Sequence, residues 1–283
     1  MRGVIRTLCV MVAVLFVVRV PRAAQAWEWP VDGGTLVSVF GSVQGEDVSR
    51  GLYIAVSSSE TPVTAVSDGS VIYATGVDDC PACLPSVLGS VIVLAHPRGF
   101  RTLYGHLSAR DTSRHANGGA RIISGETIGS IGQTGAALGP RLYLQVTDSR
   151  RSAVVNPLLL LPRLPDDEAP RIARIDLLPV EDEDNAGRIV VRAVDQVDGN
   201  AIMPYAYELL IDGQLERRLI FDVMRVDDAD GVLTLGDGSH VDAVLLPDGS
   251  VDLGIHTFVP GVSEIEVVVR DTQGNSTARR LPP

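Results

Sequence analysis

The stretch SGETIGSIGQTGAALGPRLYLQV, residues 124–146, decides the fold prediction for the first half of the chain. Its last eight residues, GPRLYLQV, alternate between polar or aromatic side chains and aliphatic ones, which is the pattern of a β-strand with one face in a core. Arg141 and Tyr143 are two residues apart and therefore share the face that is not aliphatic. Glycines recur before this strand, and Gly139-Pro140 predicts a turn at its start. The stretch thus predicts a tight turn followed by a half-buried strand.

Residues 27–160 continue in the same style, as short apolar or alternating runs separated by turn signals such as Asp68-Gly69 and Asn117-Gly118. No stretch of them has a sustained helical period. The predicted strands are Val63–Val66, Ser70–Ala74, Ser90–Ala95, Thr102–His106 and Arg141–Thr147. We therefore expect an all-β fold with an antiparallel β-sheet or barrel in this half.

A second unit is predicted after PRLPDDEAP, residues 162–170, because an acidic, Pro-rich segment favours extended conformations and spaces domains. The predicted division is a first domain over 27–162, a linker over 163–170 and a second domain over 171–283. About seven strands are predicted in the second domain, in roughly 110 residues, which is the size of an Ig-like β-sandwich. The clearest of them are Ile172–Leu178, Arg188–Val194, Tyr205–Ile211, Arg217–Val223 and Glu264–Asp271.

The charge is spread unevenly along the chain. All 24 basic residues are arginine, and the formal net charge is −11. Residues 27–165 have 11 acidic residues and 10 arginines, whereas residues 166–283 have 24 acidic residues and 10 arginines. This break favours two domains with different surfaces. The acidic second half argues against nucleic acid or anionic lipid as a partner.

The N-terminus has the pattern of a secretory signal peptide, predicted to span residues 1–26. Arg2 and Arg6 precede an apolar run at 7–18, and Ala24-Gln25-Ala26 fits a small-x-small cleavage site. The run is short for a transmembrane helix, so an uncleaved anchor is the weaker alternative. No later segment is apolar enough to span a bilayer. The expected location of the mature protein is therefore outside the cytoplasm: secreted, and periplasmic.

Four stretches occur in a specific order along the first half: FGSVQGEDVSRGLYIAV (40–56), TPVTAVSDGSVIYA (61–74), VIVLAHPRGFRTLYGHLS (91–108) and the opening stretch at 124–146. Together they resemble the β-lytic metallopeptidases of the LytM/lysostaphin type, which have the duplicated hybrid motif fold and cut peptide cross-links in bacterial cell walls. The resemblance covers about residues 29–162. It implies a LytM-type β-sheet domain.

The resemblance also implies a zinc site, held by the His and Asp of a His-x-Gly-x-Asp stretch and by the second His of a His-x-His strand. In this chain the three ligand positions are Ser49, Tyr53 and Tyr143. Arg141 stands at the first His of His-x-His, and His106 in YGHLS stands at a further histidine that the family uses. Zinc prefers imidazole, thiolate or carboxylate ligands, and a fixed cation beside it is unfavourable. We therefore expect no metal or other cofactor and no catalytic residue.

Degenerate LytM domains act in binding or in activating separate wall hydrolases, notably amidases, and the resemblance implies such a non-enzymatic role. The expected partner is peptidoglycan, or a cell-wall hydrolase or division protein. In that interpretation Tyr53, Tyr143 and Arg141 line a binding groove, with His106 as a further candidate, since arginine and aromatic residues are typical anchors in recognition. Four alternatives stay open: an active zinc endopeptidase with unusual ligands, a purely structural envelope protein, a buried His106 with no ligand, and Arg141 and Tyr143 as solvated strand residues.

Two further motifs have simpler interpretations. Cys80 and Cys83, in DDCPACLP, form a C-x-x-C pair, and in an oxidising compartment a local disulfide is favoured over a redox or metal site. The segment DDADGVLTLGD, residues 227–237, resembles a calcium loop. It lacks the carboxylate that such a loop has at its first position and the glutamate that it has at its last. Turn chemistry explains it better. His96 and His115 are expected at the surface, and His240 and His256 have no ligand spacing.

Overall fold

The computed structural model describes residues 26–45, 47–76, 86–109, 118–181, 183–227 and 231–281. The predicted signal peptide up to residue 25, the Cys80–Cys83 pair and His115 lie outside the described residues and stay predictions. Almost every element is a β-strand, so the all-β prediction is confirmed. Within the described ranges, no helix has the length and hydropathy needed to cross a membrane.

The largest sheet has ten strands in the order β19-β18-β12-β11-β8-β7-β6-β9, with β4 on β11 and β1 on β4. Its strands are β1 (Thr35–Ser38), β4 (Leu52–Ala55), β6 (Gly69–Thr75), β7 (Ser90–Ala95), β8 (Phe100–Leu107), β9 (Arg121–Ile122), β11 (Arg141–Asp148), β12 (Ala153–Val155), β18 (Val223–Val226) and β19 (Leu233–Leu235). All of the pairings are antiparallel. Strand β11 lies near the middle, with β8 along one edge and β4 and β12 sharing the other.

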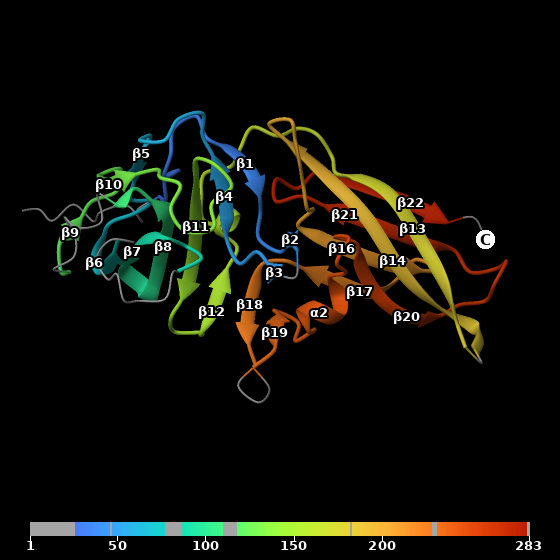
Figure 1. Cartoon of the computed structure of the whole chain (residues 1–283). Coiled ribbons are helices and arrows are strands. Elements are labelled where there is room, and N and C mark those ends of the chain that lie inside the picture. Colours follow the sequence, from blue (N-terminus) through green and yellow to red (C-terminus); the bar gives the residue numbers. More distant parts are fainter. Residues whose placement is uncertain are drawn as a thin grey trace, which may run out of the picture.

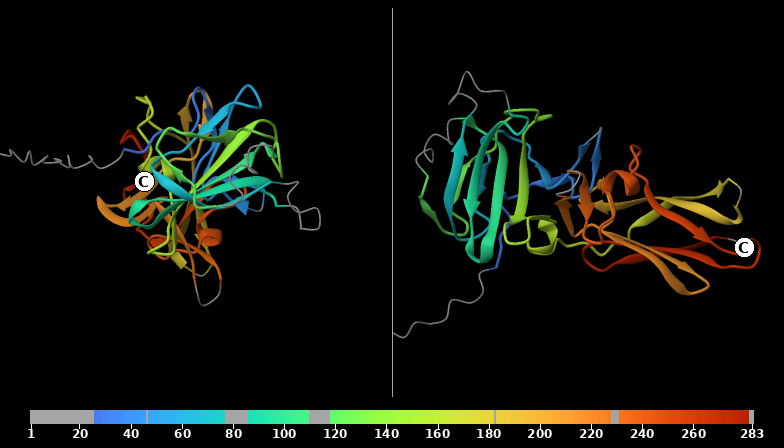
Figure 2. Two further views of the ribbon diagram at one scale, coloured as in Figure 1. Left: turned by 90° about the vertical axis from the view of Figure 1, so that its left-hand side faces the viewer. Right: turned by 90° about the horizontal axis from the view of Figure 1, so that it is seen from below.

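Shorter elements complete this half of the molecule. Strand β2 (Val43–Gln44) pairs with β3 (Asp47–Val48), and β5 (Pro62–Thr64) pairs with β10 (Thr127–Ser130). Two short 3-10 turns, η1 (Pro97–Gly99) and η3 (Pro157–Leu159), follow β7 and β12. Figure 1 shows β5 to β11 toward one end of an elongated molecule and β2 and β3 near its middle, and the right-hand view in Figure 2 shows the same elongated arrangement.

The other end is built from two four-stranded sheets. One contains β13 (Arg171–Val180), β14 (Glu183–Val197), β15 (Asn200–Ile202) and β20 (Val251–Thr257). The second contains β17 (Gln214–Ile220), β16 (Ala206–Ile211), β21 (Ile265–Arg270) and β22 (Ser276–Leu281). A single helical turn, α2 (Val241–Val244), lies before β20. Two sheets around a common core make a sandwich, while the specifically Ig-like topology stays a prediction.

Two hydrophobic cores are present, and each contains residues from the other half of the sequence. The first core is lined by strands such as β4 and β11, and it includes Val197 and Ile202 from β14 and β15. The second core fills the sandwich, and it includes Phe40 from the segment between β1 and β2. Strand β12 also pairs with β18, so the ten-stranded sheet runs from one half into the other. The halves are therefore joined by backbone pairing and by packing, as well as by residues 163–170.

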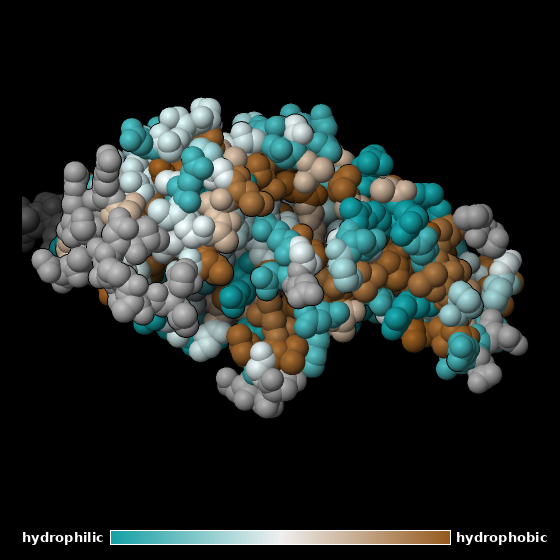
Figure 3. Space-filling view, viewed as in Figure 1, coloured by the Kyte–Doolittle hydropathy of each residue, from teal (hydrophilic) through white to brown (hydrophobic). Residues whose placement is uncertain are grey.

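The sheet ends at β19, and hydrophobic residues remain at the surface beside it. Val226, the last residue of β18, is 54% exposed. Figure 3 shows hydrophobic residues gathered on this face around β18 and β19. These apolar side chains belong to the strands that extend the first half's sheet.

The prediction that His96 is a surface residue is wrong. The side chain is buried, with Nδ1 2.8 Å from the carbonyl oxygen of Asp68 and Nε2 2.6 Å from Oγ1 of Thr102. Burial lowers the pKa of its imidazole, and the hydrogen bond to Asp68 opposes that effect. His96 therefore has a structural role between β6 and β8, which its position before a Pro-containing turn did not indicate.

Candidate functional site

The five residues that the sequence singled out lie around one cavity. Ser49, Tyr53, His106, Arg141 and Tyr143 all line a groove of about 670 Å³. They come from β4 and the loop before it, from β8 and from β11, which are neighbours in the sheet. Residues almost 100 positions apart in the sequence thus face the same space.

Strand pairing sets the two tyrosines opposite each other. Tyr143 of β11 is in register with Tyr53 of β4, and their ring centroids are 4.9 Å apart. The residues next to them in β11, Leu142 and Leu144, are fully buried in the first core. Because side chains alternate along a strand, burial of the leucines directs the tyrosines to the groove. Tyr143 is only 5% exposed, so it is not the solvated strand residue of the alternative interpretation.

Glycine allows the loop before β4 to approach β11 closely. A Cβ atom added at Gly51 would lie 2.4 Å from the carbonyl oxygen of Leu144 and 2.9 Å from the ring of Tyr143. Contacts this short are not tolerated without movement of the backbone. Gly51 therefore fixes the distance between the loop that positions Ser49 and the strand that positions Tyr143.

His106 has an unusual backbone conformation for a non-glycine residue, with φ at 62°. Its Nδ1 lies 2.9 Å from the carbonyl oxygen of Thr134 and donates a hydrogen bond to it, because a carbonyl oxygen can only accept. That contact leaves Nε2 as the nitrogen with a free lone pair. The ring centroid is 5.9 Å from that of Tyr53, so the imidazole and the two phenols form one aromatic cluster.

Two hydroxyl groups at the groove already have acceptors within the protein. Ser49 donates from Oγ to the carbonyl oxygen of Gly51 at 3.0 Å. Tyr143 donates from its hydroxyl to Oε1 of Gln145 at 2.9 Å. Ser49 and Tyr143 are buried, so these bonds satisfy groups that water does not reach freely. Their protons are engaged in positioning the side chains rather than free for chemistry.

Burial keeps the aromatic cluster uncharged. It is the largest cause of the raised pKa of Tyr53 and of Tyr143. It is also the largest cause of the lowered pKa of His106, and the nearby charge of Arg141 lowers that pKa further. At neutral pH both phenols keep their protons and the imidazole is neutral. The formal charges around the groove therefore belong to arginine and aspartate side chains.

Arg141 is only partly satisfied. It donates from Nη2 to the carbonyl oxygen of Leu138, three residues earlier. Its Nε is buried and has no hydrogen-bond partner among the described residues. A buried donor without an acceptor costs about 1–3 kcal/mol, so such groups are uncommon outside functional sites.

Four charged side chains border the groove, and three of them were missed by the sequence interpretation. Arg50 is next to Ser49, a proximity that could have drawn attention to it. Asp47 of β3 and Asp242 of α2 also line the groove. The sequence gives no sign of Asp242, because α2 comes from the second half and reaches the groove only through the shared sheet.

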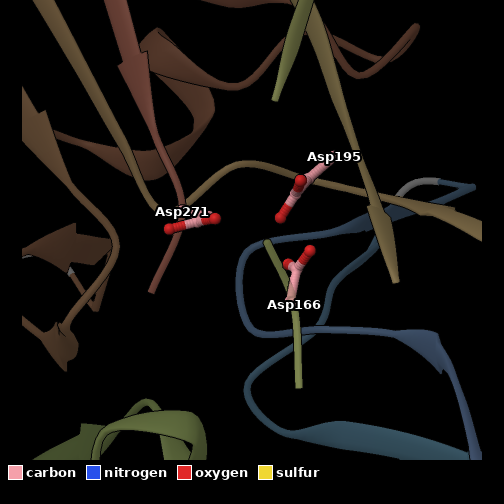
Figure 4. Close-up of side chains that lie close together, drawn as sticks. All are labelled: Asp166, Asp195 and Asp271. Atoms are coloured by element: carbon pink, nitrogen blue, oxygen red, sulfur yellow. The ribbon is translucent and has the colours of Figure 1, made fainter. Parts of the chain in front are cut away.

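In the part of the chain that the structure describes, no three His, Cys, Asp or Glu side chains of the groove lie close enough together to share a metal ion. One group of three such residues with suitable spacing occurs among the described residues, formed by Asp166, Asp195 and Asp271, whose carboxylate oxygens lie within 4.8 Å of one another. Figure 4 shows these three side chains facing a common point. None of them lines the groove.

Comparison with known proteins identifies the class of domain that bears the groove. Residues 47–157 match the model of peptidase family M23. This region is a LytM-type domain of that family, and the resemblance seen in the sequence is confirmed.

Individual relatives include a hydrolase activator, a cell division protein and an enzyme. The murein hydrolase activator EnvC of Escherichia coli is 32% identical over 129 residues, which is 46% of this chain and 27% of EnvC. The cell division protein DipM of Caulobacter vibrioides is 29% identical over 139 residues, 48% of this chain and 21% of DipM. The DD-carboxypeptidase/endopeptidase Mpg of Neisseria meningitidis is 31% identical over 85 residues, 30% of this chain and 17% of Mpg. The chain thus spans about a quarter or less of the length of these relatives.

Proposed function

We propose that this chain is a non-catalytic protein of the cell envelope that acts at the cell wall through the groove of its LytM-type domain. It binds peptidoglycan, or it recruits or activates a separate cell-wall hydrolase. The observation that supports this most strongly is the groove itself. The positions that the family uses for zinc have Ser49, Tyr53 and Tyr143 here, and two of these side chains are hydrogen-bonded within the protein.

These residues do not fit a zinc ion. Burial raises the pKa of the phenol of Tyr143, so the anionic form that could bind a metal is disfavoured. Arg141 lines the same groove and would place a permanent positive charge near the ion. His106 supplies one nitrogen, whereas a catalytic zinc site needs three protein ligands and an open position. Hydrolysis through a zinc-bound water is therefore not part of the proposal.

The relatives add support of a different kind. EnvC is named as an activator of murein hydrolases and DipM as a cell division protein. A domain that has the family's fold, with a groove whose residues do not suit the family's metal, fits a role in recruiting or activating another protein. The periplasm is the compartment in which such a role would be exercised, which agrees with the predicted signal peptide.

Two assays on the mature chain, residues 27–283, test the proposal. The first measures retention on purified wall sacculi, and the second measures dye release from labelled sacculi by a cell-wall amidase with and without the chain. We expect retention or stimulation, and a loss of either in the double variant Arg141→Ala/Tyr143→Ala. Equal behaviour of the variant and the native chain in both assays would remove the groove from the proposal and favour a structural role.

The second candidate function is a zinc endopeptidase with unusual ligands, favoured by the similarity to Mpg. Metal analysis of the purified chain and digestion of cross-linked sacculi separate it from the first. We expect no stoichiometric zinc and no cleavage. A variant with Ser49→His, Tyr53→Asp and Tyr143→His, which puts back the family's ligands, is the positive control for zinc binding. Stoichiometric zinc together with cleaved cross-links in the native chain would establish the enzyme.

A further inference from the structure

We infer that the groove recognises a short peptide through a free carboxylate, which Arg141 and Arg50 bind, while small aliphatic side chains of the peptide contact the groove's rim. The inference deepens the proposed function and rests on it, because it names the chemical class of ligand for the same groove.

The first argument is the charge that the groove leaves unpaired. Neither Arg50 nor Arg141 forms an ion pair with any described residue, although both line the cavity. Several arginines elsewhere do form ion pairs. Glu208, for example, accepts from Arg218 at 2.8 Å and from Arg270 at 3.2 Å. An arginine fork is suited to a carboxylate in particular, because both are planar and can form two parallel hydrogen bonds.

The second argument is the way in which Arg141 is held. The bond from its Nη2 to Leu138 fixes the guanidinium at the start of β11, beside Tyr143. This bond uses one of the five donors of the group, and Nε has no acceptor among the described residues. Because Nε is buried, a ligand carboxylate in the groove would accept from the terminal nitrogens of the guanidinium, where Nη1 has no partner within the protein among the described residues.

The third argument concerns what surrounds the cations. The phenols of Tyr53 and Tyr143 keep their protons, so they do not repel an anion. Val87 and Leu138, which also line the groove, are 72% and 82% exposed. Aliphatic side chains this exposed at the rim would gain from contact with small apolar groups of a ligand.

Asp47 and Asp242 limit the class of ligand. Both line the same groove, so a polyanion that filled it would meet like charges. A single carboxylate near the arginines avoids them, and a positively charged group elsewhere on the same peptide would be favoured. The balance of two arginines and two aspartates thus indicates a peptide end rather than a nucleic acid or an anionic polymer.

The test uses N-acetyl-D-alanyl-D-alanine and its C-terminal amide, titrated into the mature chain at low salt and followed by NMR or calorimetry. We expect millimolar binding of the acid and at least about tenfold weaker binding of the amide. Arg141→Gln should weaken binding of the acid by about tenfold or more, because it removes the charge and keeps a polar side chain. Asp242→Asn should leave the affinity unchanged or raise it.

Arg121→Gln is the matched control, since Arg121 is exposed on β9 and does not line the groove. It should bind as the native chain does, and thermal unfolding should show that all variants fold. Equal binding of acid and amide, no measurable binding of the acid, or an unchanged affinity in Arg141→Gln would each overturn the inference. If the native chain then still bound sacculi or stimulated the amidase, the inference about a peptide carboxylate would be rejected and the proposed function would be kept. Failure in those assays as well would remove the proposed function.

Discussion

Asp195 is a buried carboxylate that shares its surroundings with two others. It is 3% exposed, and its Oδ1 accepts one hydrogen bond, from the backbone of Gln196. Asp271 is better satisfied, because its Oδ1 accepts from three backbone N–H groups, at 2.8 Å from Gln273, 2.6 Å from Gly274 and 2.8 Å from Asn275. Burial, together with the charges of Asp166 and Asp271, raises the pKa of Asp195 to about 7. Asp195 therefore keeps its proton to a higher pH than an ordinary aspartate does.

This raised pKa makes stability depend on pH in a predictable direction. The unfolded chain releases the Asp195 proton at about pH 4, whereas the folded chain keeps it until about pH 7. Since the folded state binds more protons between these values, the free energy of unfolding contributed by this group falls as pH rises through that window. Asp195→Asn should therefore raise the midpoint of thermal unfolding at pH 8, with little or no gain at pH 4. Circular dichroism melts at intervals between pH 4 and pH 8 measure this directly.

Asp248→Asn is a control of opposite sign. Hydrogen bonds from the backbone and hydroxyl of Ser250 lower the pKa of Asp248, so its contribution is present above pH 4 and is lost as pH falls. The asparagine variant should be less stable than the native chain at pH 8. A lower midpoint for Asp195→Asn at pH 8 would contradict the assignment of the proton to that residue.

Residue-scale features differ in how far the sequence predicts them. The alternation around Tyr143 indicates which face of the strand it occupies, because burial of the neighbouring leucines follows from hydropathy alone. The burial of His96 depends on the carbonyl of Asp68 as an acceptor for Nδ1 and on the hydroxyl of Thr102 as the partner of Nε2, and hydropathy gives no sign of such partners. Asp242 could be placed only with the fold itself, because it reaches the groove beside Arg50 from an element far away in the sequence.

At the scale of elements, the groove depends on how closely the loop before β4 packs against β11. Gly51→Ala would place a methyl group against the Leu144 carbonyl and the Tyr143 ring. Such overpacking costs about 1–3 kcal/mol. We expect a lower unfolding midpoint in denaturant, and a loss of groove binding because Tyr143 must move.

Gly105→Ala is the matched control on the other side of Tyr143. Gly105 of β8 pairs with Tyr143, and a Cβ there would be 3.4 Å from its nearest neighbours, which is ordinary contact. Its effect on stability should be small. If Gly51→Ala were as stable as Gly105→Ala, the close approach would not be a constraint on the fold.

The elements themselves were largely predictable, because strand formation leaves a local signal in alternation and turn residues. The run Ser90–Ala95 coincides with β7, and the runs at 141–147 and 172–178 lie within β11 and β13. The pairing of β12 with β18 leaves no such signal. Backbone hydrogen bonds between strands do not depend on which side chains the strands have, so the sequence does not indicate which strands pair. The Pro-rich segment between β12 and β18 instead predicts that these two strands belong to separate domains.

At the scale of the whole molecule, shared packing joins the two halves. Phe40, from the first half, is 2% exposed within the second core, near Phe221 and Met224. Val197 and Ile202, from the second half, are buried in the first core. Each core therefore loses contacts if the other half unfolds, which is the condition for a single cooperative transition.

Phe40→Ala tests this coupling. Truncation of a buried phenylalanine costs about 3–5 kcal/mol, and here the lost contacts lie in the core of the opposite half. We expect calorimetry of the native mature chain to give one transition, and the variant to give one transition at a lower temperature. Val262→Ala, which shortens a side chain that is 74% exposed, should leave the midpoint unchanged. Two separate transitions, only one of them moved by Phe40→Ala, would mean that the halves unfold independently. In that case Leu233 and Asp242 would border the groove only while the halves remain docked, and binding at the groove would then weaken on heating before the first half unfolds.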